Sequence, residues 1–137
     1  MNIAFFLLPK SETVYLVENQ TVRQGLEKLR HHGYTAVPLL DKDGRYVGTL
    51  TTADFLWYLK EQHNLDLVKA EKTFLTDVPR EHHKDAVSVN CEIQDLFIKA
   101  MEQNFIPVVD DYDTYIGIVR RRDIMEYFRG QVPAEFK

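Results

Sequence analysis

Two short segments of the sequence combine residues that could bind a phosphorylated ligand. The first is Gly48-Thr49-Leu50-Thr51-Thr52-Ala53-Asp54, in which an apolar run gives way to hydroxyl and carboxyl side chains. The helix start that we expect here leaves backbone N–H groups unpaired, and these groups favour an anion together with the helix dipole. The Thr51 hydroxyl could donate to a phosphate oxygen, and the Asp54 carboxylate could accept hydrogen bonds from vicinal ribose hydroxyls. The alternative is that Thr51 only caps the helix and Asp54 only complements its dipole.

The second segment, Gly117-Ile118-Val119-Arg120-Arg121-Arg122-Asp123, keeps the aspartate but has an arginine in place of Thr51. Three adjacent side chains cannot share one helical face, so we expect Arg120, Arg121 and Arg122 to fan outward around the helix start. Each cation there opposes the helix dipole at a cost of about 0.3–1 kcal/mol. Phosphate groups would offset that cost through charge-assisted, sometimes bidentate bonds. The alternative is a solvated basic patch that pairs with three nearby acids, Asp110, Asp111 and Asp113.

An internal repeat relates these two segments and organises the chain. Six residue identities recur at a spacing of 69 residues, with apolar positions matching between them. The pairs are Pro38 and Pro107, Asp41 and Asp110, Tyr46 and Tyr115, Gly48 and Gly117, Asp54 and Asp123, and Tyr58 and Tyr127. Upstream the spacing becomes 71 residues, as for Val22 and Ile93, so the second copy is two residues shorter at one connection.

Each copy predicts the same order of elements, β-α-β-β-α, from its hydrophobic periodicity and turn signals. In the first copy the expected ranges are Thr13–Val17, Gln20–His32, Ala36–Leu40, Tyr46–Leu50 and a helix capped by Thr51 or Thr52. In the second they are Val87–Val89, Glu92–Gln103, Phe105–Val109, Tyr115–Val119 and Arg120–Phe128. We therefore expect an α+β fold of two repeats, residues 1–64 and 65–137, packed with pseudo-twofold symmetry because each alone would leave one sheet face bare.

The segment before each Pro-containing strand is a candidate site for a purine base. Backbone N–H and C=O groups there could read an adenine edge, with apolar side chains on either side of the ring. The residues are Tyr34, Thr35, Ala36 and Val37 in the first copy, and Phe105, Ile106 and Pro107 in the second. The alternative is an ordinary core strand, which we also expect for the side chains of Val37 and Ile106.

Composition and charge exclude several classes of function. The 137 residues are 45% hydrophobic and 28% charged, with a net charge of −4, which argues against disorder and against a broad nucleic-acid or anionic-membrane surface. The apolar start Met1–Leu8 lacks a charged flank and a cleavage site, and it is too short to span a membrane. Together with a single cysteine, Cys91, these features predict a soluble cytoplasmic protein.

No residue pattern predicts catalysis or a metal site. Cys91 is expected to be a small core residue, and the adjacent pairs His31-His32 and His82-His83 lack the spacing of metal ligands. The sequence has no Gly-x-Ser-x-Gly elbow, P-loop, Cys-x-x-Cys pair or paired acid and base on one helix. We therefore expect no catalytic residue, no metal and no cofactor, and a bound nucleotide as a ligand only.

The repeated unit resembles the CBS domain. The resemblance rests on the Pro-containing strand ending in Asp41 or Asp110, the hairpin, and the Gly-to-Asp segment that leads into a helix, and it covers nearly the whole chain. The tandem pair resembles a Bateman module, and stand-alone pairs from Gram-positive bacteria that bind cyclic di-AMP look closest. Gly33–Pro38, Leu75–Arg80 and Arg121-Arg122 look like segments of those proteins.

The resemblance implies a non-catalytic sensor that binds an adenine nucleotide, cyclic di-AMP or AMP, ADP or ATP, in the cleft between the repeats. It assigns phosphate contact to Thr51 and ribose contact to Asp54, and the loss of the threonine in the second copy puts a second identical site in doubt. We expect a homodimer that signals to a separate effector protein. The helical residues Phe55, Trp57, Leu59, Met125 and Phe128 would suit that dimer or else belong to the core. The alternative function is a structural dimeric adaptor with a vestigial cleft.

Overall fold

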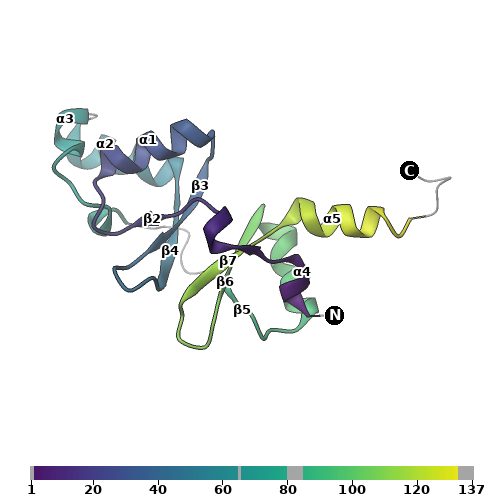
Figure 1. Cartoon of the computed structure of the whole chain (residues 1–137). Helices are drawn as coiled ribbons and strands as arrows, with labels where there is room; N and C mark the ends of the chain where they lie inside the picture. Colours follow the sequence, from purple (N-terminus) through teal and green to yellow (C-terminus); the bar gives the residue numbers. More distant parts are fainter. Residues whose placement is uncertain (1, 65, 80–84, 133–137) are drawn as a thin grey trace. The chain divides into compact units, whose positions relative to one another are not determined.

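The computed structural model describes residues 2–64, 66–79 and 85–132 of the chain. The chain divides into two compact units (Figure 1). We call Val14–Asp85 the repeat-1 unit, and we call Met1–Thr13 together with Ala86–Lys137 the repeat-2 unit. We place the boundary of the sequence repeats between residues 64 and 65, so the structural units do not coincide with the sequence repeats.

The repeat-1 unit contains a three-stranded sheet in the order β2-β3-β4, in which β2 and β3 are parallel and β3 and β4 are antiparallel. Its elements are β2 (Leu16–Val17), α1 (Val22–His32), β3 (Ala36–Leu40), β4 (Tyr46–Thr51), α2 (Thr52–His63), α3 (Leu67–Ala70) and a 3₁₀ turn (Leu75–Asp77). The order β-α-β-β-α matches the prediction, and β3 has the predicted bounds.

The repeat-2 unit contains a four-stranded sheet in the order β1-β7-β6-β5. Its elements are a 3₁₀ turn (Ile3–Phe6), β1 (Leu8–Pro9), a 3₁₀ turn (Lys10–Glu12), β5 (Val87–Ser88), α4 (Ile93–Glu102), β6 (Phe105–Val109), β7 (Tyr115–Arg120) and α5 (Arg121–Arg129). In each antiparallel hairpin the register shifts just before the last residue of the first strand, between Leu39 and Leu40 in β3 and between Val108 and Val109 in β6. The predicted fold class, α+β with two β-α-β-β-α repeats, is confirmed.

Local sequence signals explain where the elements begin and end. The side chain of Thr21 accepts from the backbone of Gln24, and the Gln24 side chain accepts from the backbone of Thr21, so that both ends of this capping box stabilise the start of α1. Gly33 ends α1 with φ +70°, a left-handed conformation that costs glycine little. In β4 the side chains alternate between buried and half-buried, whereas β3 is buried from Val37 to Leu40, as an inner strand requires.

Each unit has its own apolar core, to which both helices and strands contribute. In the repeat-1 unit, helix residues Val22, Leu29, Phe55 and Leu59 pack with strand residues Leu16, Val37, Leu39 and Leu50. In the repeat-2 unit the corresponding core is built from Val87, Leu96, Ile106, Val108, Val119 and Ile124, together with Ile3 and Phe6. Phe55 and Leu59 are therefore core residues and not part of a dimer face, whereas Trp57, Met125 and Phe128 are exposed.

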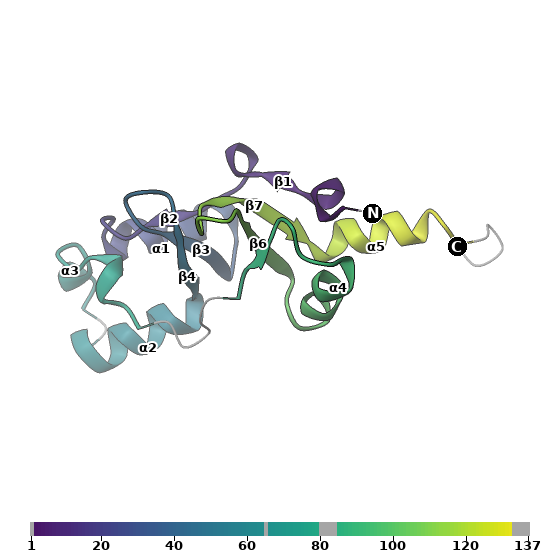
Figure 2. The same cartoon turned by 90° about the horizontal axis from the view of Figure 1, so that it is seen from below.

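The N-terminal segment completes the repeat-2 unit, an arrangement that the predicted boundary did not anticipate. Leu8 and Pro9 pair antiparallel with Ile118 and Gly117, so β1 lies alongside β7 (Figure 2). Ile3 is 1% exposed in the same core. Because the pairing adds a fourth strand at the β7 edge, it also covers backbone groups that would otherwise be unpaired.

Tyr46 and Tyr115, which occupy equivalent positions in the two repeats, hydrogen-bond to residues next to the points where the chain passes from one unit to the other. The Tyr115 hydroxyl donates to Thr13 Oγ1 at 2.9 Å, and the backbone N–H of Asp85 donates to the Tyr46 hydroxyl at 3.3 Å. Tyr46 also shares a 2.7 Å hydrogen bond with the Thr49 hydroxyl. Both rings are buried, at 3% exposure for Tyr46 and 1% for Tyr115.

We expect Tyr115→Phe to lower the free energy of unfolding by about 0.5–1.5 kcal/mol, because it removes a hydroxyl that is hydrogen-bonded to Thr13. Tyr112→Phe is the matched control, since Tyr112 lies in the same hairpin but is 78% exposed. Thermal and urea unfolding of both variants would measure the difference. Equal stability of the two variants would show that the bond to Thr13 contributes nothing.

Candidate functional site

Backbone pairing brings together the predicted base and phosphate segments of the repeat-1 unit. Ala36, the first residue of β3, pairs with Thr51, the last residue of β4. Next to this pair the backbone N–H of Thr52 donates to the carbonyl of Thr35 at 2.9 Å. The antiparallel ladder therefore fixes Thr35 and Ala36 beside the start of α2, where the phosphate contact is expected.

Thr51 and Asp54 form a capping box at the start of α2. The Asp54 N–H donates to Thr51 Oγ1 at 3.2 Å, and the Thr51 N–H donates to Asp54 Oδ2 at 2.8 Å. Asp54 is 6% exposed, and no other charged residue in the described part of the chain is as deeply buried. The capping that we gave as the alternative is thus present. It does not exclude ligand contact, because Thr51 Oγ1 acts as the acceptor in the cap and its hydroxyl hydrogen can still donate.

The remaining predicted residues of the repeat-1 unit have different environments. The Tyr34 ring is 49% exposed and stacks on the His32 ring, with the ring centroids 5.5 Å apart and the planes 19° from parallel. Val37 is 1% exposed and belongs to the core, as expected for its side chain. The backbone of Thr35 and Ala36 is the part of this segment that lies beside the start of α2.

The repeat-2 unit reproduces this backbone arrangement. Phe105, the first residue of β6, pairs with Arg120, the last residue of β7. The N–H of Arg121 donates to the carbonyl of Asn104 at 2.8 Å, as Thr52 does to Thr35 in the other unit. Ile106 and Pro107 are buried, as we expected for the Ile106 side chain, whereas Phe105 is half-buried.

The side chains at this second helix start are arranged differently. Arg120 makes a forked ion pair with Asp123, with Nε 2.7 Å from Oδ2 and Nη2 3.1 Å from Oδ1. Arg121 turns toward α4, where Nε donates to the Ala100 carbonyl at 2.6 Å and Nη1 donates to Asn104 Oδ1 at 3.0 Å. Arg122 is exposed. Arg120 and Arg121 thus have different partners, and α5 has no side-chain cap.

The acidic turn between β6 and β7 has contacts of its own. Asp110 accepts hydrogen bonds from the backbone of Tyr112 at 2.8 Å and of Thr114 at 3.0 Å, and Asp111 accepts from Asn90 at 3.3 Å. Asp110 therefore stabilises the turn of the hairpin, and Asp111 joins this turn to the loop that follows β5.

A pocket of about 270 Å³ lies beside Asp123 in the repeat-2 unit. Its volume is close to the lower end of the roughly 300–1,000 Å³ that small-molecule pockets span. The lining residues are Phe5, Phe6, Leu7, Leu8, Asp123 and Tyr127. The rings of Phe5, Phe6 and Tyr127 contact one another edge to face, with centroids 5.2–5.6 Å apart.

Sequence reasoning found Asp123 but missed the other five lining residues of this pocket. The sequence indicates only an apolar start for the N-terminal segment and only a repeated identity for Tyr127. A signal was available, because Leu8-Pro9 recurs in the sequence as Val78-Pro79 at a spacing of 70 residues. Val78 is 1% exposed in the repeat-1 core, so each unit includes one such segment.

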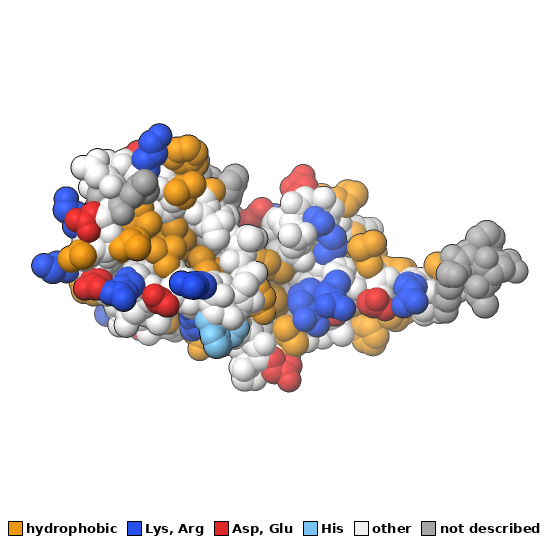
Figure 3. Space-filling view, turned by 90° about the horizontal axis from the view of Figure 1, so that it is seen from above, with side chains coloured by type: hydrophobic (Ala, Val, Ile, Leu, Met, Phe, Trp, Pro, Cys, Tyr) orange, Lys and Arg blue, Asp and Glu red, His pale blue; other side chains and the backbone are white. Residues whose placement is uncertain are grey.

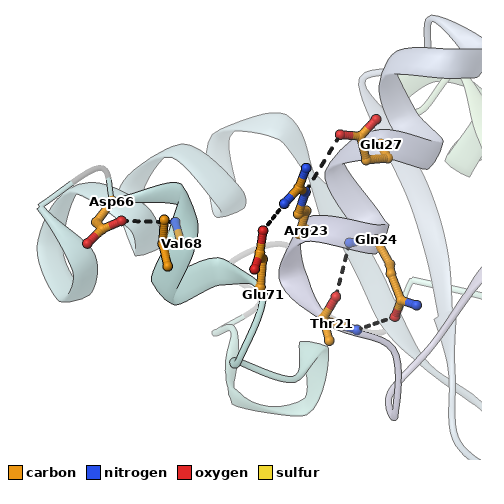
Figure 4. A network of polar contacts seen from close by, with 7 residues as sticks. All are labelled: Thr21, Arg23, Gln24, Glu27, Asp66, Val68 and Glu71. Atoms are coloured by element: carbon orange, nitrogen blue, oxygen red, sulfur yellow. Dashed lines mark hydrogen bonds and ion pairs between the residues drawn. The ribbon is translucent and has the colours of Figure 1, made fainter.

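A second pocket, of about 310 Å³, lies in the repeat-1 unit between α1 and α3 and includes none of the predicted site residues. Figure 3 shows hydrophobic side chains gathered over this part of the unit, and Leu67 and Val68 are both largely exposed. Arg23 pairs here with Glu71 and, at 4.0 Å, with Glu27 (Figure 4). The first pair joins α1 to the end of α3 and the second lies within α1; both are on an exposed surface, so their contribution to stability is small.

The other residues that could carry chemistry have structural roles or lie outside the described residues. Burial raises the pKa of the Cys91 thiol, and the nearby carboxylates of Asp95 and Glu92 raise it further, so the thiol is mostly protonated at neutral pH. Cys91 packs against the repeat-2 core, as expected. His82-His83 lies outside the described residues. Within the described ranges, no three His, Cys, Asp or Glu side chains gather as a metal site, and no helix is long and apolar enough to cross a membrane.

Comparisons with known proteins agree with the repeated architecture. Residues 7–61 and 76–130 each match the CBS domain family. Cyclic di-AMP receptor B of Bacillus subtilis is 27% identical over 126 residues, which span 88% of this chain and 82% of that protein. The similarity therefore covers most of both chains.

Two solved structures have the same fold. The CbpB protein of Listeria monocytogenes in complex with c-di-AMP superposes with a TM-score of 0.82 at 17% identity, covering 94% of this chain and 96% of that one. The structure of CBSX2 in complex with AMP superposes with a TM-score of 0.71 at 19% identity, covering 94% and 96%. At these identities the likeness concerns the fold.

Proposed function

This chain belongs to the CBS domain family, and we propose from that premise that it is a non-catalytic regulatory protein that senses an adenine nucleotide. One observation carries the proposal. The buried Asp54 carboxylate lies in the first turn of α2, beside the Thr51 hydroxyl and next to the edge of β3. The arrangement offers a helix N-terminus and a hydroxyl to a phosphate, and a carboxylate to a ribose.

The named relatives support adenine as the base of the ligand. One relative is called a cyclic di-AMP receptor, and solved structures of the same fold contain c-di-AMP or AMP. For this chain we propose cyclic di-AMP, AMP, ADP or ATP, bound with the phosphate at Thr51 and the ribose at Asp54. The backbone of Thr35 and Ala36 then faces the base, because it lies beside Thr51 in the sheet.

We also propose that the protein acts in the cytoplasm as a homodimer that signals to a separate effector protein. Binding of a nucleotide can change such an interaction only if the ligand has different affinities for the states that differ in partner contact. Trp57, Met125 and Phe128 are the exposed apolar side chains of α2 and α5 that suit contact between copies.

Thermal unfolding in the presence of AMP, ADP, ATP, cyclic di-AMP and, as a control, GTP tests the proposal. A ligand at about 100 times its Kd stabilises the native state by roughly 2.7 kcal/mol. For a chain of 137 residues this corresponds to a rise in Tm of several degrees. If none of the adenine ligands raises Tm, the chain is a structural adaptor with a vestigial site and not a sensor.

A further inference from the structure

We propose that Arg120 is a specificity-determining residue that closes the ribose site of the repeat-2 unit. Its forked ion pair occupies both carboxylate oxygens of Asp123. Asp123 corresponds to Asp54 in the sequence repeat. The inference rests on the proposed function, because it assumes that this carboxylate binds ribose in a CBS repeat.

The two units agree in the backbone around the helix start, and the side chain next to the aspartate in space is Thr51 in one and Arg120 in the other. Arg120 and Thr51 each end the second hairpin strand, and each pairs across the ladder with the first residue of the preceding strand. Both precede a helix whose first N–H donates to the residue before that strand, Thr35 or Asn104. The closed state of the repeat-2 site is therefore attributable to the arginine side chain, because the backbone that would support a site is in place.

The ion pair competes directly with a vicinal diol. Nε and Nη2 of Arg120 donate to Oδ2 and Oδ1 of Asp123, and a pair of ribose hydroxyls would donate to the same two oxygens. In the repeat-1 unit, Thr51 stands at the position of Arg120; its hydroxyl accepts from the Asp54 N–H and its own N–H donates to Asp54 Oδ2. In the repeat-2 unit, a ribose must displace the Arg120 guanidinium from Asp123.

The surroundings of Asp123 are suited to a nucleoside once the arginine is removed. Asp123 lines the 270 Å³ pocket whose other walls include the rings of Phe5, Phe6 and Tyr127. Aromatic and apolar walls with one polar group are typical of small-molecule pockets. The side chains of Arg120 and Asp123 are 41% and 31% exposed, so the ion pair lies where solvent and solutes can reach it.

Arg120→Thr, which restores the residue of the other repeat, tests the inference in an Asp54→Asn background that disables the repeat-1 site. We expect Asp54→Asn/Arg120→Thr to bind adenosine at least fivefold more tightly than Asp54→Asn alone, measured by calorimetry. Adenosine is the main probe because it has ribose hydroxyls and no phosphate that could draw Arg120 away from Asp123. AMP is the second probe, and we expect it to gain less than adenosine, because the substitution also removes a cation.

Arg129→Thr in the same background is the matched control, because it removes the same charge from an exposed position in the last turn of α5. It should leave adenosine binding unchanged. Adding Asp123→Asn to the double variant should remove the gained affinity. Melting curves of each variant without ligand show whether it is folded.

The possible outcomes separate this inference from the proposed function. If Asp54→Asn/Arg120→Thr binds adenosine no better than Asp54→Asn, Arg120 does not close the site and the inference is wrong. If the unmodified chain binds no adenine nucleotide but the Arg120→Thr chain does, the proposed function is wrong for the repeat-1 site and the inference stands. If Arg129→Thr produces the same gain, the effect is one of net charge and the ion pair is not its cause.

Discussion

Replacing Asp54 with asparagine is expected to weaken adenine-nucleotide binding by about 10- to 100-fold. A hydrogen bond to a charged group contributes about 1.5–3 kcal/mol, and the amide retains one acceptor but loses the charge. The Thr51 N–H can still donate to the amide oxygen, so the start of α2 keeps part of its cap. Calorimetric titration with whichever adenine nucleotide raises Tm most would measure the loss.

The capping box of Asp54 makes a stability control necessary, and the same unit supplies one. Thr21 and Gln24 form a second capping box at the start of α1 (Figure 4), so Thr21→Ala removes a comparable cap. We expect Thr21→Ala to lower the free energy of unfolding by about 1 kcal/mol and to leave the Kd unchanged. If Asp54→Asn lowered stability like Thr21→Ala but left binding intact, the carboxylate would serve only as a cap.

The sequence predicts most elements because their signals are local or repeated. Hydrophobic periodicity and turn residues give the strands Ala36–Leu40 and Phe105–Val109 with the bounds that the structure shows. The cap at Thr51 and the stop at Gly33 follow from side-chain and backbone preferences that act within a few residues. The repeat then transfers each assignment to the other copy.

The sequence predicts the pairing of positions within each candidate site but not the side-chain conformations. The repeat register places Thr51 with Asp54 and Arg120 with Asp123, and the structure brings each pair into contact. The spacing of three residues on one helical turn allows the Arg120–Asp123 pair, but an arginine has several rotamers. The acids of the β6–β7 turn lie at the other end of β7, so the hairpin register separates them from Arg120.

The N-terminal strand could not be assigned because its partner is about 110 residues away in the chain. Leu8 and Pro9 pair with Ile118 and Gly117, and two residues give no periodicity from which to identify a strand. The recurrence of Leu8-Pro9 as Val78-Pro79 was the available signal, but it indicates only that the two segments are equivalent. Which unit each segment joins is settled by long-range packing.

Gly117→Ala is expected to detach this N-terminal strand and to destabilise the repeat-2 unit strongly. Gly117 has φ +151°, and a Cβ built there lies 2.1 Å from the Leu8 carbonyl oxygen, which belongs to the backbone of the paired strand. Backbone strain of about 1–3 kcal/mol then adds to a steric cost of about 1–3 kcal/mol. Moving β1 away relieves the clash but withdraws Ile3 and Phe6 from the core.

Gly33→Ala separates the two costs, because Gly33 also has a positive φ of +70° but no atom within 4 Å of a Cβ built there. We expect it to lose only the roughly 1–2 kcal/mol of a left-handed alanine. Hydrogen exchange should show faster exchange at the β1–β7 amides in Gly117→Ala and no change there in Gly33→Ala. Because Leu8 also lines the pocket beside Asp123, Gly117→Ala should weaken any ligand of the repeat-2 unit as well. Equal destabilisation by the two alanines, with β1–β7 protection intact, would mean that β1 contributes little to the stability of that unit.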